Sequence, residues 1–271
     1  MLQDNAWTGL FFLAGICCGS YLMGIAVVLA VSTGTISAVL LKYSKDEINN
    51  GLYGFSAALV GVALICFFQP TIIIWTGIIL GSVLATIIQH LFIIKKIPAF
   101  TFPFILVTWL FLAVAHYYPA LIHPQPVVNN LYANSYLELF SHGFGQVIFQ
   151  DNIWAGILFV IGVFISRPIA AIYAVVSIAL SAAMAYWLGE PVNDIYLGLL
   201  SYNAVLCAIT FAGKKAEDFM MGLIAVVLSV LIMIGMRHLN LPALTFPFVL
   251  ATWLALVTKV TKQRIGLKLR Q

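Results

Sequence analysis

The sequence predicts an all-α polytopic membrane protein built from two inverted homologous repeats of five transmembrane helices each. Three observations support this prediction: an apolar composition, an internal repeat that runs through the chain, and a one-sided distribution of basic residues. A re-entrant half-helix is expected before the second repeat, and its counterpart before the first repeat is expected to be truncated.

The composition is that of a chain that lies within a lipid bilayer. Of its 271 residues 63% are hydrophobic and 8% are charged, and the mean hydropathy is +1.06. A soluble domain carries about 25% charged residues. The basic residues behind the net charge of +4 stand between apolar runs, which is typical of loops that orient helices in a membrane and not of nucleic-acid binding. The four cysteines lie inside apolar runs without metal-ligand spacing, so we expect no metal and no cofactor.

Three segments of the first half return in the second half. The longest is IPAFTFPFILVTWL, which starts at Ile97 and returns as LPALTFPFVLATWL from Leu241, 144 residues later. The other pairs, each 147 residues apart, are QDNAWTG at 3–9 with QDNIWAG at 150–156, and GLYGFSAAL at 51–59 with GLLSYNAVL at 198–206. The two halves are therefore homologous, and the boundary between such halves is where membrane proteins usually place a permeation site.

Ten apolar runs are candidates for transmembrane helices. Breaking the runs at proline, glycine and charge clusters gives the ranges 7–29, 31–42, 50–68, 71–94, 98–118, 152–166, 168–188, 195–211, 218–236 and 242–259. Since lipid offers no hydrogen-bond partners, backbone groups in these runs must bond one another, as they do in helices. The first repeat is therefore assigned to residues 1–118 and the second to residues 135–271, with 119–134 as an external linker.

The basic residues predict the orientation of these spans. With the C-terminal tail placed in the cytoplasm, 12 of the 13 Lys and Arg residues fall on the cytoplasmic side, and only Arg237 falls outside. Both termini are therefore expected in the cytoplasm. Because each repeat holds five spans, an odd number, the two halves enter the membrane from opposite sides, which is the arrangement of an inverted repeat.

The segment before the second repeat is too short to span a membrane. Residues 119–150 contain no Lys or Arg, and they become apolar from Ser135 onward. A helix over 136–149 would reach about 21 Å, short of a hydrocarbon core of about 30 Å. We expect a re-entrant half-helix here, since irregular backbone at membrane depth is tolerated against protein or a water-filled path. The alternative is an interfacial helix that lies flat on the bilayer.

The distribution of acidic residues argues against ion coupling and against catalysis. All nine lie at span ends, in loops or in the half-helix segment: Asp4, Asp46, Glu47, Glu138, Asp151, Glu190, Asp194, Glu217 and Asp218. Proton- and sodium-coupled carriers use ionisable groups at mid-membrane, and an intramembrane hydrolase needs an acid–base constellation or a metal. The sequence therefore favours passive conduction of a neutral solute, and we expect no catalytic residues.

The strongest local signal is a Pro-x-x-Thr-x-Pro-Phe element that occurs once in each repeat. Its two prolines, five residues apart, remove backbone donors and free carbonyls at a helix start, which is costly in lipid unless a polar group lies nearby. Thr101 and Thr245 stand between the prolines. An inverted repeat would bring the two hydroxyls together near the middle of the membrane. The alternative is plain helix capping by the threonines.

Several segments resemble the urea transporter family. They are QVIFQDN from Gln146, GLLSYNAVL from Gly198, GLYGF from Gly51 and both Pro-Thr-Pro elements, and the resemblance covers essentially the whole chain. It implies a homotrimer in which each subunit has its own pore. That pore is a narrow slot between the inverted halves, closed at each end by apolar side chains and lined with oxygens, through which urea moves passively. A compact chain without a soluble domain favours the bacterial plasma membrane, that is, the inner membrane.

Carried over residue by residue, the resemblance places the outer slot on the half-helix. There Gln146 would bond urea, Phe149 would stack on its face, and Val147 would line the constriction. By the 147-residue offset the counterpart of Phe149 is Leu2, and that of Gln146 would precede Met1. We therefore expect the first half-helix to be absent from this chain through a truncated start, and one wall of oxygens with it.

The resemblance also implies a middle site with aliphatic walls. The residues concerned are Thr101 and Thr245 at the site, Leu52 and Leu199 narrowing it, and Ile48 and Ile195 at a wall position that is often Phe in the family. The aliphatic pair Ile48 and Ile195 leaves no aromatic face at that position for urea to stack on.

Urea also suits these residues on physical grounds. It is planar and neutral, with four N–H donors and one strong acceptor, and slot hydroxyls and half-helix carbonyls would replace the water that its N–H groups lose. The working hypothesis is a passive urea channel. A pore for another small neutral solute, such as ammonia, short amides or water, is the alternative. A coupled secondary transporter would instead depend on a proton or sodium gradient.

Overall fold

The computed structural model describes residues 3–126 and 135–268. Within these residues there is no β-strand, only an isolated bridge between Phe68 and Pro124. Thirteen α-helices and one 3-10 turn make up the described residues. Four of the helices, α2, α5, α9 and α12, are individually long and apolar enough to cross a membrane. The bent pair α7–α8 would make a fifth span. The prediction of an all-α polytopic membrane protein is confirmed.

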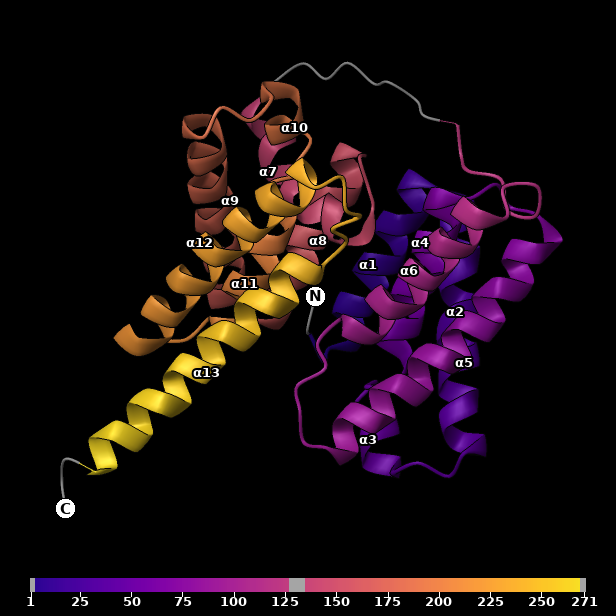
Figure 1. Ribbon diagram of the computed structural model, residues 1–271, viewed down its shortest axis with the longest axis horizontal. Coiled ribbons are helices and arrows are strands. Elements are labelled where there is room, and N and C mark those ends of the chain that lie inside the picture. The colour runs from indigo at the N-terminus through magenta and orange to yellow at the C-terminus, as the bar shows by residue number, and fades with distance from the viewer. Residues whose placement is uncertain (1–2, 127–134, 269–271) are drawn as a thin grey trace.

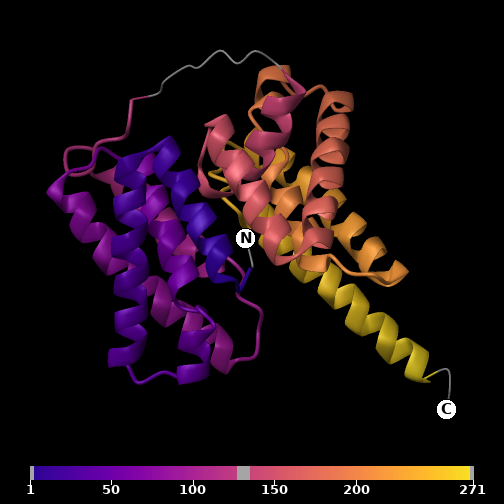
Figure 2. The same cartoon turned by 180° about the vertical axis from the view of Figure 1, so that it is seen from behind.

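The helices fall into two groups that lie side by side (Figure 1). The first group contains α1 (Ala6–Gly19), α2 (Tyr21–Leu40), α3 (Lys45–Asn49), α4 (Gly54–Phe67), α5 (Ile72–Ile94) and α6 (Phe102–Tyr117). The second contains α7 (Tyr136–Gly145), the 3-10 turn η1 (Gln146–Ile148), α8 (Ile153–Ser166), α9 (Pro168–Trp187), α10 (Val192–Tyr196), α11 (Tyr202–Phe211), α12 (Ala216–His238) and α13 (Phe246–Lys268). The view from behind shows the same division (Figure 2).

Each helix from α1 to α6 has a counterpart among α8 to α13. The helices α1, α2 and α3 begin 147 residues before α8, α9 and α10, and α5 and α6 begin 144 residues before α12 and α13. The local chemistry repeats as well. The side chain of Asn5 accepts from two backbone N–H groups at the start of α1, and that of Asn152 does the same for α8. An N-cap of this kind satisfies donors that have no acceptor within the helix.

Equivalent helices α1 and α8 pack antiparallel. Near the start of α1, Thr8 Oγ1 donates to the carbonyl of Gly162, near the end of α8, over 2.8 Å. A Cβ added to Gly15 would lie 2.6 Å from the ring of Phe159, and one added to Gly162 would lie 3.0 Å from the ring of Phe12. Those two rings meet edge-on at 5.2 Å. The glycines let the helix backbones approach closely, and the antiparallel contact means that the two halves run in opposite directions.

The predicted boundary between the first two helices is wrong. The ranges 7–29 and 31–42 place it at residue 30, whereas α1 ends at Gly19 and α2 begins at Tyr21. Between them Ser20 is extended, with φ −157° and ψ 118°, and its side chain accepts from the backbone N–H of Met23, so it caps α2. The counterpart of Tyr21 is Pro168 at the first position of α9, so the repeat itself carried the signal for this break.

Two short helices were also missed. The predicted spans 50–68 and 195–211 begin too early, since α4 begins at Gly54 and α11 at Tyr202. Turns lead into these helices from α3 and α10, which are separate helices of five residues each. Each turn contains a glycine with positive φ, 70° at Gly51 and 72° at Gly198. A left-handed residue of this kind reverses the chain and favours glycine.

The segment before α8 is buried in protein. Ser135 and Glu138 form a capping box at the start of α7, and the chain then bends by 78° between η1 and α8. His142, Phe144 and Val147 are 3% exposed or less. This burial does not fit a helix lying flat on the bilayer. Residues 127–134 of the expected linker, residues 269–271 of the expected cytoplasmic tail, and Leu2 lie outside the described residues.

Candidate functional site

The two threonines of the Pro-Thr-Pro elements meet at the boundary between the halves. Their hydroxyl oxygens are 2.6 Å apart, so one hydroxyl donates to the other, and both side chains are buried. Thr101 occupies the N-cap position of α6, but its side chain caps no backbone N–H. Plain helix capping by Thr101, the alternative considered from the sequence, is therefore not what the structure contains.

A local two-fold axis passes through this threonine pair. Trp109 Nε1 on α6 donates to the carbonyl of Pro242 over 2.8 Å, and Trp253 Nε1 on α13 donates to the carbonyl of Pro98 over 2.8 Å. The two bonds are related by the 144-residue offset that also relates Thr101 to Thr245. Each Pro-Thr-Pro element therefore has one carbonyl bonded by a tryptophan of the other half, which fixes the register in which the halves meet.

The backbone before each threonine is left-handed. Phe100 has φ 48° and Leu244 has φ 46°, at equivalent positions. Bulky residues rarely adopt this conformation, and strain of this kind persists only where the surrounding structure holds it. It turns the chain sharply into the first turn of α6 or α13, so that the threonine hydroxyl faces the other half.

Phenylalanine rings cluster at the two Pro-Thr-Pro elements. Three residues beyond each threonine, Phe104 and Phe248 are fully buried. The ring of Phe104 lies 6.1 Å from that of Phe149, which itself lies 5.5 Å from Phe67. In the other half, Phe248 meets the ring of Phe100 at 5.3 Å. Aromatic rings from both halves thus lie close to the Pro-Thr-Pro elements.

The outer-slot residues expected from the sequence lie together at the end of α7. Gln146 is the C-cap residue of α7 and is half-buried, Val147 is buried in η1, and Phe149 is half-buried with φ 56°. The ring contact between Phe149 and Phe104 connects this segment to α6. The structure therefore brings Phe149 into the cluster of rings at the Pro-Thr-Pro elements.

The aliphatic residues expected at the walls lie on α3 and α10 and on the turns that follow them. Leu52 and Leu199 are half-buried in those turns, and Ile195 is 4% exposed on α10. Ile48 on α3 helps to line a hollow of about 400 Å³, with Val39, Lys42, Tyr43, Lys45 and Asn49. Ile48 and Ile195, and likewise Leu52 and Leu199, sit at equivalent places in the two halves.

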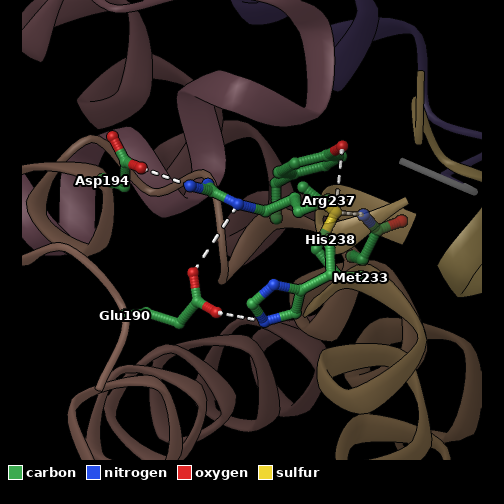
Figure 3. Close-up of polar contacts among 7 residues, drawn as sticks. Glu190, Asp194, Met233, Arg237 and His238 are labelled. Atoms are coloured by element: carbon green, nitrogen blue, oxygen red, sulfur yellow. Dashed lines mark hydrogen bonds and ion pairs between the residues drawn. The ribbon is translucent and has the colours of Figure 1, made fainter. Parts of the chain in front are cut away.

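An ion-pair cluster ties α10 to the end of α12 (Figure 3). Arg237 donates from Nη2 to Asp194 on α10, and its Nε lies 3.6 Å from Glu190 Oε2. His238 Nε2 lies 3.8 Å from Glu190 Oε1. The Glu190 side chain is only 8% exposed, so its charge is held by the guanidinium rather than by bulk water. This cluster fixes the short helix that carries Ile195.

The first half clamps its short helix with different chemistry. Glu47 on α3 occupies the position equivalent to Asp194, and it accepts a hydrogen bond from Tyr53 Oη. Since that hydroxyl donates to Glu47, His90 Nδ1 on α5 donates to Tyr53 Oη, over 2.8 Å. Tyr43 stacks on His90 at 3.5 Å. Burial, followed by the hydrogen bond and charge of Glu47, raises the pKa of Tyr53, which keeps its hydroxyl protonated.

This chain is similar to known proteins over nearly its whole length. A sequence model described as Urea transporter matches residues 1–260. This chain belongs to the urea transporter family. It is 27% identical to Urea transporter 1 of Rattus norvegicus over 94% of this chain and 73% of the rat protein. It is 26% identical to Urea transporter 1 of Capra hircus, with the same coverage of both chains.

Two polar residues of this family member were missed from the sequence. Tyr202 and Asn203 on α11 both bond the backbone next to Thr245, and both are buried. Their counterparts in the first half are Phe55 and Ser56. The aligned repeats could have revealed these residues. Phe55-Ser56 in the first half aligns with Tyr202-Asn203 in the second, which has more hydrogen-bonding groups. Among the described residues, no group of three or more His, Cys, Asp or Glu side chains could hold a metal ion.

Proposed function

We propose that this protein conducts urea passively across the membrane through a slot between its two repeats. The observation that carries the proposal is the threonine pair. Two buried hydroxyls from opposite halves bond each other on a local two-fold axis, in elements where phenylalanine rings cluster. Membership of the urea transporter family supports urea as the solute.

The chemistry of the threonine pair suits a small amide. A hydroxyl offers one donor and two lone pairs, so the Thr101–Thr245 bond leaves one donor and several lone pairs unused. Urea would accept from the free donor through its carbonyl and donate to a lone pair through an N–H group. The hydroxyls satisfy each other when no solute is present, which lowers the cost of an empty site and lets urea leave as readily as it enters.

The remaining site residues complete the proposed slot. Gln146 offers an amide and Phe149 a ring face at the outer end, where Val147 narrows the path. Four aliphatic side chains form the walls: Ile48, Leu52, Ile195 and Leu199. The ring contact between Phe149 and Phe104 supports a connection between the outer end and the threonine pair.

The positions of acidic residues support conduction without ion coupling. On α12 the carboxylates are Glu217 and Asp218 in the first turn, and on α7 the carboxylate is Glu138 in the first turn. Carriers that couple to protons or sodium place ionisable groups in the interior of their spans. The proposed activity is transport and not catalysis.

The cellular setting is part of the proposal. The distribution of Lys and Arg supports cytoplasmic termini and a multi-pass protein of the plasma membrane, in bacteria the inner membrane. A homotrimer with one slot in each subunit is proposed from the resemblance to the family.

Stopped-flow light scattering on proteoliposomes tests the function. Under an outward urea gradient, urea leaves the vesicles and water follows. We expect the vesicles to shrink much faster than protein-free vesicles, with glycerol as the control solute. Imposing a proton or sodium gradient should leave the urea rate unchanged, because the carboxylates of α7 and α12 lie in the first turns of those helices and not in their interiors. Urea flux equal to that of empty vesicles would overturn the proposal. Equal permeability to urea and glycerol would indicate a general pore, and gradient-driven accumulation would indicate a coupled carrier.

A further inference from the structure

One buried amide holds the backbone on both sides of Thr245. Asn203 Nδ2 donates to the carbonyl of Leu244 over 3.3 Å, and the backbone N–H of Phe248 donates to Asn203 Oδ1 over 3.1 Å. Tyr202 Oη donates to the same Leu244 carbonyl. Asn203 is 1% exposed and Tyr202 is 8% exposed, so water does not compete for these bonds. Residues 244 and 248, which flank Thr245, are therefore held from α11.

The backbone at this place needs such partners. Phe248 lies in the first turn of α13, where N–H groups have no acceptor within the helix. Leu244 has φ 46°, and its carbonyl accepts hydrogen bonds from side chains of α11. A buried backbone group without a partner costs about 1–3 kcal/mol. Asn203 satisfies both groups at once, as an N-cap supplied by a neighbouring helix.

The first half lacks this arrangement. The residues equivalent to Tyr202 and Asn203 are Phe55, which has no polar side-chain atom, and Ser56. Ser56 is fully buried, and its hydroxyl has no hydrogen-bond partner among the described residues. The two threonines thus meet on a two-fold axis. In the described part of the chain, side chains of the same half bond the backbone beside Thr245 but not the backbone beside Thr101.

We propose that Asn203, assisted by Tyr202, is a positioning residue that fixes the Thr245 hydroxyl for urea. The proposal rests on the urea-conducting function proposed above. Thr245 is the rigid member of the pair. Thr101 is the member that moves when urea replaces the Thr101–Thr245 hydrogen bond, because its loop lacks the equivalent side-chain bonds. Asn203 touches no solute in this account and acts only through Thr245.

The variant Asn203→Ser tests this role, because it gives position 203 the residue type of its first-half counterpart, Ser56. We expect urea flux to fall on the order of threefold to tenfold, as expected when a binding group loses its positioning. In a Thr245→Val background the same change should have no further effect, because the hydroxyl that Asn203 positions is already gone. In a Thr101→Val background it should retain its full effect. The matched control Ser56→Ala should leave the flux unchanged.

Tyr202→Phe gives a second test that preserves shape. It removes one of the two donors to the Leu244 carbonyl and keeps the ring, so the protein should fold, and thermal unfolding in detergent checks that it does. We expect a smaller fall in urea flux than for Asn203→Ser, again absent in the Thr245→Val background. Rates are compared per folded protein at a protein-to-lipid ratio that keeps the slowest variant above the lipid background.

The outcomes separate the two proposals. Equal fractional losses from Asn203→Ser with and without the Thr245 hydroxyl would overturn the positioning role, since the amide would then act through general stability or through its own contact with urea. Unchanged flux in both Asn203→Ser and Tyr202→Phe would overturn it as well. Absence of urea flux in the unmodified protein would instead refute the proposed function itself.

Discussion

Urea flux is expected to fall about tenfold when Thr245 is replaced by valine. The substitution keeps the shape of the side chain, removes one hydroxyl from the centre of the proposed slot, and leaves the buried Thr101 hydroxyl without its partner. A lost hydrogen bond costs about 0.5–1.5 kcal/mol, and about 1.4 kcal/mol corresponds to a factor of ten in rate. Thr101→Val should have a similar effect because of the two-fold arrangement. Stopped-flow measurement on proteoliposomes checks both.

Thr8→Val is the matched control for these variants. Its hydroxyl is also buried and also bonds across the boundary between the halves, to the carbonyl of Gly162. It lies on α1 and belongs to neither Pro-Thr-Pro element. This variant should lose about 1 kcal/mol of stability, as for a typical internal hydrogen bond, while each folded molecule conducts urea at the normal rate. Normal flux in both Thr101→Val and Thr245→Val would remove the threonine pair from the path.

Gly198→Ala is expected to cause the largest loss of stability among single substitutions considered. Gly198 has φ 72°, and the left-handed conformation costs an L-residue roughly 1–2 kcal/mol. An added Cβ would also lie 2.5 Å from the backbone carbon of His142 and 2.7 Å from the backbone nitrogen of Gly143 on α7. Forcing atoms into such a contact typically costs a further 1–3 kcal/mol. Because α7 carries Gln146 and leads to Phe149, urea flux should fall together with the melting temperature.

Gly51→Ala separates the cost of the left-handed backbone from the cost of the clash with α7. Gly51 is the counterpart of Gly198 and has nearly the same φ, 70°, but a Cβ there would meet no atom of the described residues within 4 Å. It should therefore show only the cost of the left-handed backbone, with little change in urea flux. Thermal unfolding in detergent gives the melting temperatures of the two variants. The difference between them measures the destabilisation caused by the contact with α7. Equal melting temperatures would contradict the close packing of α7 against the α10–α11 turn.

The general architecture was predictable because it rests on features that the sequence repeats. The apolar composition predicts a membrane protein. The offsets of 144 and 147 residues relate the start of most helices in the first half to the start of a helix in the second half. The break at Ser20 was missed because apolar residues continue through it, so hydropathy alone gave no boundary. The short helices α3 and α10 were missed because five-residue helices have no periodic pattern to detect.

The centre of the site was predictable, but the residues that hold it were not. The meeting of Thr101 and Thr245 followed from one element occurring in two halves of opposite direction. The bonds from Asn203 to residues 244 and 248 depend on how α11 packs against the start of α13, which no local pattern contains. The clamps Glu47–Tyr53–His90 and Asp194–Arg237 likewise join residues far apart in sequence.

Locating a bound analogue shows whether urea passes between the hydroxyls of Thr101 and Thr245. Selenourea has the shape of urea, and the anomalous scattering of its selenium marks its position in crystals of the protein. We expect a selenium peak beside the threonine pair, with the analogue within about 3.5 Å of at least one hydroxyl oxygen. That peak should be lost in the Thr101→Val, Thr245→Val double variant. Selenium peaks confined to other parts of the molecule, or a peak that persists in the double variant, would contradict passage of urea between these hydroxyls.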